Sequence, residues 1–461
     1  MRSELVEKLE EIVGKDWVAT EKEAILDYLL DETAPTVCPK PVSDVVLVKP
    51  RITQEISSIL KLANQLKVPA FPRGGGTGLV GSCIPTERGI VLSLERMNRV
   101  IEVDRENLMI VVEAGVTLQK LMEAADEVGL LFPPHPGDET AQVGGLLACN
   151  AGGARAVRYG VMRNYVKGIE FVLPTGEILN LGGKLLKDVA GYDLVQLMIG
   201  SQGTLGIITK VTLKLYSKFR ETATLIIPYE DRHDALRTTT RILQEGMIPL
   251  AIEYVEMELM EKSARQLGKE WPVKKGEASL IVIVTGNNKE EIYVDAEKID
   301  KIAREYNAID TLIVEKKRKQ DEILSIRSNI YLILKPHTMD ILDVAVPPAS
   351  IAKLMDALDE IARKYNMYLP IYGHAGDGNL HPHILTKKAG GVEEEDLEKV
   401  KKEIYDVTIG LGGTITAEHG IGKIRIKDFN RYLDQKAIEV MKKIKKVFDP
   451  NNILNPGTVV P

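Results

Sequence analysis

A run of glycines behind a short apolar segment constrains the fold more than any other stretch. Residues 72–81 read PRGGGTGLVG, and residues 76–81 match G-x-G-x-x-G, the pattern that precedes the dinucleotide-binding helix of a Rossmann fold. Pro85 and Gly89 follow so closely that such a helix has no room. No Lys-Ser or Lys-Thr pair follows either, which excludes a P-loop. The sequence predicts instead a loop whose backbone N–H groups form an anion-binding concavity, with a purely structural turn as the alternative.

A second glycine-rich segment lies about 70 residues further along the chain. Residues 144–153 read GGLLACNAGG, and their small side chains leave backbone exposed to a planar or extended ligand. We interpret this segment as a second loop. Two such loops suit a long ligand with a phosphate middle and an aromatic end.

Composition excludes several classes of protein. The chain of 461 residues is long enough for two or three domains, and its net charge of −6 gives no electrostatic footprint for nucleic acid. No apolar run reaches the roughly 18 residues of a membrane span, and the N-terminus lacks the apolar core of a secretory signal. Its three cysteines are far apart, which excludes a disulfide framework and an iron–sulfur cluster ligated within the chain. We therefore expect a cytoplasmic protein that is not integral to a membrane.

Apolar periodicity predicts an α+β organisation. A short strand at residues 44–48, a helix capped by Thr53 and a second strand before the glycine loop form a β-α-β start. Short strands follow, and Thr117 is the predicted N-cap of a further helix. The character of the sequence changes around residue 218, so we expect domains at 1–218 and 219–412 and a C-terminal segment at 413–461.

Histidines and acids gather near the C-terminus. Three of the seven histidines lie in residues 373–383, GHAGDGNLHPH, and a fourth lies in residues 416–423, TAEHGIGK. The turn between His374 and His381 can direct both imidazoles toward one point, and Glu418 can add a carboxylate, which is a ligand set for a divalent metal. The alternative is two glycine-stabilised turns with hydrogen-bonded histidines. The residues alone leave this choice open.

Four long motifs resemble one known superfamily. PRGGGTGLVGSCIP, VEAGV, PPHPGDETAQVGGLLACNAGGARAVRYG and GYDLVQLMIGSQGTLGIITKVTL look like the FAD domain of the vanillyl-alcohol oxidase / p-cresol methylhydroxylase (PCMH) superfamily. Within it the chain is most similar to the family of glycolate oxidase and FAD-linked D-lactate dehydrogenase, with D-2-hydroxyglutarate dehydrogenase as a cousin. The resemblance runs from about residue 40 to 458. It implies a PCMH-type FAD domain of two subdomains, a ferredoxin-like antiparallel cap domain that binds substrate, and a C-terminal segment that completes the active site and returns to the FAD domain.

The resemblance also implies a set of FAD-binding residues. The first glycine loop would bind the pyrophosphate, and the later segments would line the isoalloxazine and ribityl groups. Covalent members of the family carry a histidine in or beside the first loop, whereas this loop has none, so we expect non-covalent FAD. The implied residues are Arg73, Gly74, Gly75, Gly76, Thr77, Gly78, Leu79, Pro136, Gly137, Asp138, Gly144, Gly145, Ala148, Asn150, Gly152, Gly153, Tyr159, Gly160, Ile207 and Ile208.

The resemblance assigns roles in the histidine and acid cluster. His374, His381 and Glu418 would bind one divalent ion, which the ligand set allows to be Zn, Mn or Fe. His419 would be the catalytic base, and Asn379 and His383 would support the metal site or face the substrate.

A separate arginine is implied in substrate binding. Arg327 would bind the substrate carboxylate in a bidentate way. Hydroxyglutarate enzymes have a threonine and a lysine where this chain has Tyr331 and Ile341. Contacts for a second carboxylate are therefore missing, which favours a short monocarboxylate.

The expected function is FAD-dependent oxidation of D-lactate or glycolate to the 2-oxo acid. The metal would bind the carboxylate and the hydroxyl group, His419 would take the hydroxyl proton, and hydride would pass to flavin N5. Electrons would then pass to a quinone, to a diffusible acceptor or to a partner protein. The partner would be an iron–sulfur subunit or an electron-transfer flavoprotein, and it would hold the chain at a membrane surface. The alternatives are a D-2-hydroxyglutarate-type dehydrogenase, an alkyl-glycerone-phosphate-synthase-like or oxygen-using flavoenzyme, and a non-catalytic flavin-carrying subunit.

Overall fold

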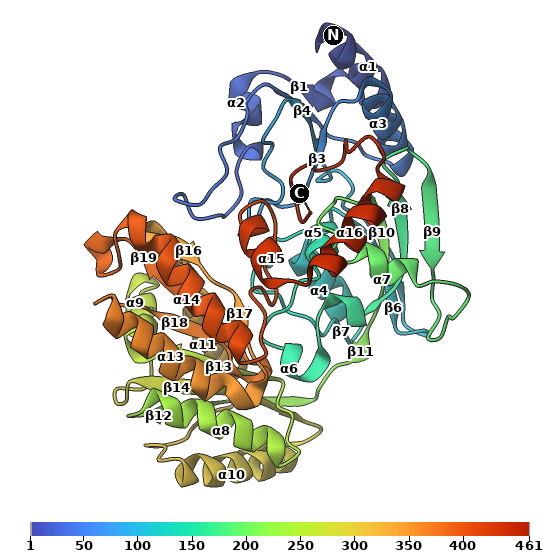
Figure 1. Ribbon diagram of the computed structural model, residues 1–461. Coiled ribbons are helices and arrows are strands. Elements are labelled where there is room, and N and C mark those ends of the chain that lie inside the picture. The colour runs from blue at the N-terminus through green and yellow to red at the C-terminus, as the bar shows by residue number, and fades with distance from the viewer. Residues whose placement is uncertain (1, 461) are drawn as a thin grey trace.

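The computed structural model describes residues 2–460 and contains two α+β domains (Figure 1). The N-terminal domain, blue to green, lies at the upper right of Figure 1, and the central domain, yellow-green to orange, lies at the lower left. Within residues 2–460 no helix has both the length and the apolar character of a membrane-spanning segment.

A mixed sheet forms the first half of the N-terminal domain. Its strand order is β1-β2-β4-β3, and both β2 and β3 run parallel to β4. Helix α3 (Thr53–Leu66) connects β2 to β3, so the predicted β-α-β start is confirmed. The predicted cap was wrong, because Ile52 is the N-cap residue and the Thr53 hydroxyl donates instead to Glu170. The other elements here are α1 (Arg2–Val13), η1 (Lys15–Trp17), β1 (Val18–Ala19), α2 (Lys22–Ile25), η2 (Leu26–Tyr28), β2 (Val45–Val48), β3 (Ala70–Arg73) and β4 (Gly89–Ser93).

An antiparallel sheet forms the second half of this domain. Its strand order is β5-β6-β10-β8-β9, and alternate residues of β10 such as Val211 and Leu213 are buried in one apolar core with α4 and α5. The predicted cap of α4 is confirmed, since the Thr117 side chain accepts from the Lys120 N–H at 3.2 Å. The elements are β5 (Val100–Asp104), β6 (Met109–Glu113), α4 (Leu118–Glu127), β7 (Leu130–Leu131), α5 (Val143–Cys149), α6 (Ala156–Tyr159), η3 (Met162–Asn164), β8 (Val166–Val172), β9 (Ile178–Gly182), α7 (Leu194–Met198), β10 (Ile207–Lys214) and β11 (Tyr216–Ser217).

The central domain is a long antiparallel sheet with helices on both faces. The order is β15-β12-β14-β13-β18-β19-β16, with β17 paired to β19. Along β12, Leu225 and Ile227 pack with α8, α10, α13 and α14, whereas Ile226 packs with α9, α11 and α12. Helices are therefore present on each side of the sheet. The antiparallel α+β architecture matches the predicted fold class.

The central elements have the following bounds. Strands are β12 (Glu221–Tyr229), β13 (Ala251–Glu256), β14 (Ala278–Gly286), β15 (Leu312–Val314), β16 (Thr338–Ile341), β17 (Val344–Ala345), β18 (Ile371–His374) and β19 (Asn379–Leu385). Helices are α8 (Arg232–Gln244), α9 (Met257–Gln266), α10 (Lys289–Glu305), α11 (Lys317–Ser328), α12 (Ile330–Leu334), η4 (Lys335–His337), η5 (Pro348–Ser350), α13 (Ile351–Lys364), η6 (Ala375–Asp377), η7 (Lys387–Ala389), η8 (Glu394–Asp396) and α14 (Leu397–Gly410).

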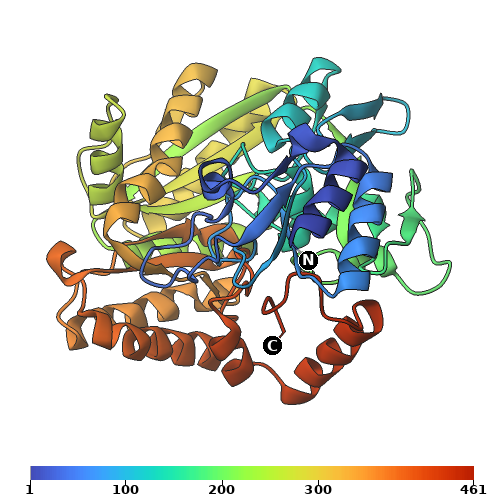
Figure 2. The same cartoon turned by 90° about the horizontal axis from the view of Figure 1, so that it is seen from above.

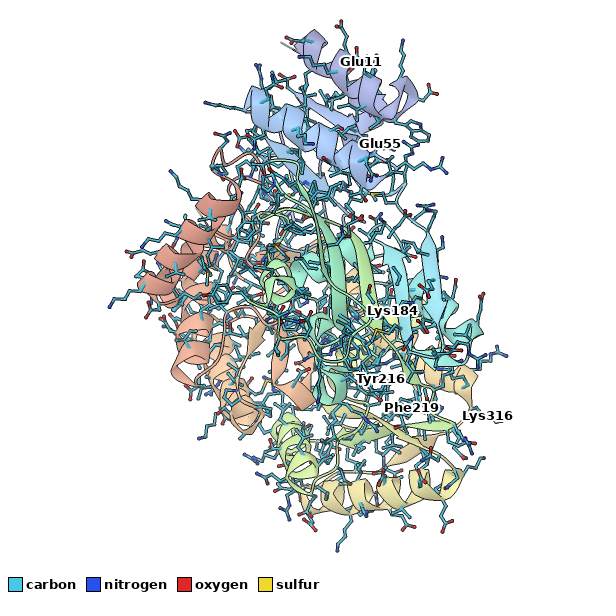
Figure 3. The ribbon with its side chains drawn as sticks, turned by 90° about the vertical axis from the view of Figure 1, so that its right-hand side faces the viewer. Glu11, Glu55, Lys184, Tyr216, Phe219 and Lys316 are labelled. Carbon is cyan, nitrogen blue, oxygen red and sulfur yellow. The ribbon has the colours of Figure 1, made fainter. Side chains whose placement is uncertain are left out.

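An aromatic contact joins the two domains where the chain passes between them. The rings of Tyr159 and Tyr216 lie 5.7 Å apart, and those of Tyr159 and Phe219 lie 6.3 Å apart. Figure 3 labels Tyr216 and Phe219 at this junction. The chain passes here from β11, which ends at Ser217, to β12, which begins at Glu221, and the domain boundary near residue 218 stays a prediction.

The C-terminal segment bonds to both domains. It contains α15 (Ile426–Tyr432) and α16 (Gln435–Phe448) and runs from the central domain to the N-terminal domain, as the red ribbon in Figure 2 shows. The buried Arg425 guanidinium forms two 2.5 Å bonds with Asp340 of β16. Further along, the Asn455 N–H donates to the Ala70 carbonyl of β3 at 2.8 Å. These bonds fix the residues before and after α15 and α16 to different domains.

Candidate active site

A cavity of about 1170 Å³ lies between the two domains. The glycine loop (residues 74–79), helix α5 and the loop 135–139 line it from the N-terminal domain, and strands β13, β18 and β19 line it from the central domain. Its volume reaches the upper end of the roughly 300–1,000 Å³ of most small-molecule sites. The cavity therefore has room for a large cofactor together with a small substrate.

The glycine loop runs directly from β3 toward β4. Residues 82–88 are described throughout and form turns and bends with no helix, so the exclusion of a Rossmann motif is confirmed. Gly76 has a φ of 74°, which favours glycine, and a Cβ at Gly75 would lie 3.1 Å from the Thr140 carbonyl oxygen. The loop thus presents bare backbone to the cavity.

Arg73 connects this loop to the segment at residues 27–30. Its guanidinium donates to the carbonyls of Asp27 at 2.8 Å and Leu30 at 2.7 Å. A Cβ at Gly76 would overlap the same guanidinium. By bonding to these two carbonyls, the Arg73 side chain holds the glycine loop against the segment that contains Asp27 and Leu30. Arg73 also borders the cavity.

The second glycine-rich segment is largely a helix, which corrects the predicted loop. Residues 143–149 form α5, and Asn150 ends it with a left-handed φ of 59°. The helix forms because Val143, Leu146 and Leu147 are buried in the core below the sheet, and this packing outweighs the low helix propensity of Gly144 and Gly145. The two glycines face different surroundings. A Cβ at Gly144 would lie 2.7 Å from the Ala114 Cβ, whereas a Cβ at Gly145 would meet no described atom within 4 Å.

Four of the residues expected to bind the cofactor are not among those lining the cavity. The Asn150 carboxamide accepts from the Arg163 N–H at 3.0 Å, and a Cβ at Gly153 would lie 2.3 Å from the His135 carbonyl oxygen. Tyr159 packs in the aromatic junction, and a Cβ at Gly160 would overlap the Asn164 side chain. These positions shape turns beside the cavity. The expected residues that do line it are Arg73, Gly74, Gly75, Gly76, Thr77, Gly78, Leu79, Pro136, Gly137, Asp138, Gly144, Gly145, Ala148, Gly152, Ile207 and Ile208.

Three imidazoles converge on one carboxylate oxygen at the far end of the cavity. The Oε1 atom of Glu418 lies 3.5 Å from His374 Nε2, 3.4 Å from His381 Nε2 and 3.7 Å from His419 Nε2. The rings of His381 and His419 are stacked, 5.2 Å apart and 11° from parallel. The predicted cluster is therefore assembled, with its members drawn from β18, β19 and the turn at residues 416–420.

Strand pairing explains this convergence. β18 and β19 are antiparallel, with Tyr372 opposite His381 and His374 opposite Asn379. Because side chains alternate between faces, Tyr372, His374 and His381 share the cavity face, while Ile371 and Leu380 enter the core with α13 and α14.

Glu253 of β13 is a carboxylate that was not predicted from the sequence. It is buried, and its Oε1 accepts from His374 Nδ1–H at 2.6 Å. This bond orients the imidazole so that Nε2 points to the cluster. Carboxylates stand behind metal-binding histidines in the same way. The sequence indicates Glu253 only as a charged residue inside the apolar run of residues 251–255. That position does not identify the residue with which it pairs.

Charge coupling dominates the cluster. Burial would by itself lower the pKa of His374, but Glu253 and Glu418 outweigh it and raise that pKa well above its usual value. Burial would raise the pKa of Glu418, yet His374 and His381 hold it well below the ordinary range. Burial lowers the pKa of His381. The cluster therefore keeps the Glu418 carboxylate ionised and His381 more readily neutral, which are the forms that bind metal, whereas His374 would have to release a proton to a bound ion.

Arg327 pairs with the same glutamate. Its Nη2 lies 2.5 Å from Glu253 Oε2, although the N–H is not aligned for a hydrogen bond, and its guanidinium carbon lies 5.1 Å from the Tyr372 ring centre. The Nε atom of Arg327 has no hydrogen-bond partner among the described residues. The arginine borders the cavity and retains a free N–H.

His383 and Asn379 lie behind the cavity wall. Thr338 donates its hydroxyl to the Leu334 carbonyl, so His383 Nδ1–H donates to Thr338 at 2.9 Å and His383 Nε2 is left to accept from the Tyr372 hydroxyl at 3.3 Å. Burial holds the pKa of His383 well below its usual value, which keeps it neutral. The Asn379 Nδ2 donates to Asp343 at 3.0 Å. Both residues support neighbours of the cluster.

The comparisons with known proteins agree over nearly the whole chain. The family described as FAD linked oxidases, C-terminal domain, matches residues 218–459, and the FAD binding domain family matches residues 45–182. The chain belongs to the FAD-linked oxidases. A D-lactate dehydrogenase of Archaeoglobus fulgidus is 43% identical over 94% of this chain and 95% of the relative, and glycolate oxidase subunit GlcD of Bacillus subtilis is 38% identical over 89% and 88%. The structure of p-cresol methylhydroxylase with substrate bound matches with a TM-score of 0.79 at 18% identity, over 99% of this chain and 96% of that one, and shows the shared fold alone.

FAD fits the residues of the cavity. The bare backbone of residues 74–76 suits a pyrophosphate, because a nest of N–H groups binds anions, and the open space over Gly145 suits a flat ring system. The resemblance drawn from the motifs and the PCMH-type fold are thus confirmed. The protein is an FAD-dependent oxidoreductase.

A divalent metal also fits its expected ligands. A tetrahedral ion with bonds of about 2.0–2.1 Å separates neighbouring ligand atoms by roughly 3.4 Å. The distances from Glu418 Oε1 to His374 Nε2 and His381 Nε2 have this size and are too long for strong hydrogen bonds. The possible ligand atoms of Asp343, His381, Glu418 and His419 also lie within 4.8 Å of one another.

We predict that Gly145→Val lowers FAD affinity by roughly tenfold or more, because the added side chain enters cavity space that the cofactor requires. The measurement is titration of the apoprotein with FAD, followed by flavin fluorescence. The matched control is Gly410→Val, since Gly410 is also helical and its added Cβ would meet no described atom within 4 Å. Equal FAD affinity in wild type and Gly145→Val would contradict the assigned position.

Proposed function

We propose that the protein oxidises a short D-2-hydroxy monocarboxylate, D-lactate or glycolate, to its 2-oxo acid. The observation that carries this proposal is the convergence of His374, His381 and His419 on Glu418 within the cavity that the glycine loop also lines. A scaffold that only carries flavin has no use for such a cluster. The named activities of the two curated relatives support the same substrate class.

The chemistry divides between bound groups and side chains. FAD, when bound, supplies the redox chemistry, and a divalent ion held by His374, His381 and Glu418 would supply Lewis-acid polarisation of the substrate hydroxyl. His419 takes the hydroxyl proton as general base. Its ring, stacked on His381 and bordering the cavity, is in a position to meet a hydroxyl beside the cluster.

Arg327 binds the substrate carboxylate in this proposal. Arg327 borders the cavity and supplies the positive charge that a carboxylate needs, while Glu253 balances part of that charge when no substrate is present. Tyr372 lies against the guanidinium and is itself held by His383, so the arginine has few alternative positions.

Tyr331 and Ile341 favour a monocarboxylate over a dicarboxylate. Both line the cavity, and the Tyr331 hydroxyl donates to the Glu32 carbonyl at 2.7 Å. Neither offers a cation to a second carboxylate. A D-2-hydroxyglutarate substrate would therefore bury a charge beside groups that cannot neutralise it.

Electron transfer onward requires an acceptor outside this chain, because its three cysteines do not form a cluster motif. We propose a cytoplasmic protein whose electrons pass to a partner, either an iron–sulfur subunit or an electron-transfer flavoprotein, or to a quinone.

FAD should be held without a covalent bond, since residues 73–79 contain no histidine to carry it. Denaturation with acid is then expected to release all flavin into the supernatant. Flavin that stays on the precipitated polypeptide would show a covalent link.

Anaerobic mixing with D-lactate or glycolate should bleach the flavin absorbance. D-2-hydroxyglutarate should react with kcat/KM lower by about 100-fold, because neither Tyr331 nor Ile341 offers a cation to its second carboxylate. Ile341→Lys supplies a cation and should narrow this gap. Comparable kcat/KM for both acid classes in the wild type would contradict the proposed substrate class.

His419→Ala should slow anaerobic flavin reduction by about 10²–10⁴-fold, which is the usual contribution of a general base, while FAD content stays unchanged. His233→Ala is the control, because His233 bonds to Asp359 and is not among the residues lining the cavity. Chelator treatment should abolish reduction in the wild type, and Zn²⁺, Mn²⁺ or Fe²⁺ should restore it. Full reduction after complete metal removal would refute the metal-dependent mechanism.

A further inference from the structure

We propose that Asp343 is the positioning residue that holds the turn at residues 416–420 so that Glu418 and His419 face His374 and His381. This inference rests on the proposed metal site and adds a residue that the resemblance does not assign. Asp343 lies between β16 and β17 and is 3% exposed. Its place in the sequence indicates no role of its own.

One carboxylate oxygen of Asp343 accepts from most of the turn. Its Oδ2 accepts from the N–H groups of Ala417, Glu418 and His419, each at 2.8 Å, and from the Thr416 hydroxyl at 2.8 Å. Three successive amides pointing at one anion form a nest, and this geometry fixes the backbone dihedrals of the residues that supply it. The side-chain directions of Glu418 and His419 are thereby set from the backbone.

The second oxygen links the turn to the strand that carries His381. Asp343 Oδ1 accepts from Asn379 Nδ2 at 3.0 Å and lies 3.7 Å from His381 Nδ1. That nitrogen is buried and has no hydrogen-bond partner in residues 2–460. A small shift would let it donate to Asp343, in the way that His374 Nδ1 donates to Glu253. Asp343 then orients one histidine as well as the turn.

These bonds also explain why Asp343 supports the ligands and is not a ligand itself. Oδ2 already has four donors and has no acceptor capacity left for an ion, whereas Oδ1 has one donor and lies 3.7 Å from His381 Nδ1. The proximity of Asp343 to His381, Glu418 and His419 follows from this holding role.

The N-terminal domain holds the opposite side of the turn. Cys149, at the end of α5, donates its thiol to the Glu418 carbonyl at 3.0 Å and lies 3.3 Å from the His419 carbonyl oxygen. Burial raises the pKa of this thiol to about 12, so the donor proton is retained. A Cβ at Gly152 would lie 2.8 Å from Glu418 Oε2. With its amides held by Asp343 and its carbonyls by Cys149, the turn has one position relative to both domains.

The test is the affinity of the FAD-loaded protein for Zn²⁺ and Mn²⁺, measured by competition with a chelator. Asp343→Asn keeps one acceptor oxygen but turns the other into an N–H₂ donor, which would face either the turn amides or Asn379 Nδ2. This variant should weaken ion binding by about 10–100-fold, the usual effect of losing a group that orients metal ligands. FAD content should not change. Unchanged ion affinity in Asp343→Asn would overturn the proposal.

Asp234→Asn is the matched control. Asp234 is also buried, but it bonds to Arg237 and Asn307, and none of these residues lines the cavity. This variant should lower the melting temperature while the folded protein keeps its ion affinity. An equal loss of ion affinity in both variants would show that Asp343 contributes only to the stability of the fold. That result would overturn the positioning role.

Two further results separate the possible failures. Thr416→Val removes one of the donors and should weaken ion binding by roughly 2- to 10-fold, the range for a single hydrogen bond, so the proposal stays testable if Asp343→Asn does not fold. No loss in Thr416→Val, with Asp343→Asn unfolded, would count against the proposal. A wild-type protein that binds neither ion would refute the proposed metal site, and the inference would fail with it.

Discussion

The site depends on the antiparallel pairing of β18 with β19. The tight turn between them requires glycine, since Gly378 has a φ of 83° and an added Cβ would overlap the Val346 carbonyl oxygen. Gly373 is equally constrained, because its Cβ would lie 2.3 Å from the Asn379 carbonyl oxygen. Once this pairing forms, the pleat places His374 and His381 on one face with their ring centroids 5.5 Å apart. A shift of one residue in this pairing would place the two imidazoles on opposite faces of the sheet.

Alternating charges make the buried cluster tolerable. Arg327, Glu253, His374 and Glu418 follow one another in space, so each charge has a neighbour of opposite sign or an imidazole that can carry a proton. Isolated buried charges of this kind would be strongly destabilising. The arrangement lets a cavity with apolar walls contain an anionic Glu418. A bound cation would take the place of the proton that His374 carries next to Glu418. The same row joins Arg327 to Glu418 through Glu253 and His374.

Local rules predicted part of this structure. Pro85 and Gly89 were enough to exclude a Rossmann helix, because this exclusion depends on nearby residues. The spacing of the histidines suggested a ligand set with Glu418 but left the alternative open, and the family resemblance assigned their roles. Helix α5 was mistaken for a loop, since its stability comes from packing under the sheet and not from its glycine-rich sequence. Glu253 and Asp343 could not be found, because their partners lie far away along the chain and the contacts exist only after the strands have paired. A single acidic residue in an apolar strand indicates that it has a buried partner, but the sequence does not identify which residue that partner is.

The docking of the C-terminal segment has a consequence for the order of assembly. Arg425 fixes the segment to β16 and Asn455 fixes it to β3, so Glu418 and His419 reach their positions only after both domains have formed. Contacts that join residues so distant in sequence, such as Cys149 with Glu418, close slowly. A chain still emerging from the ribosome has its glycine loop long before Glu418 and His419 are made. The cavity wall is therefore synthesised in stages, and the residues of its histidine and acid cluster come last.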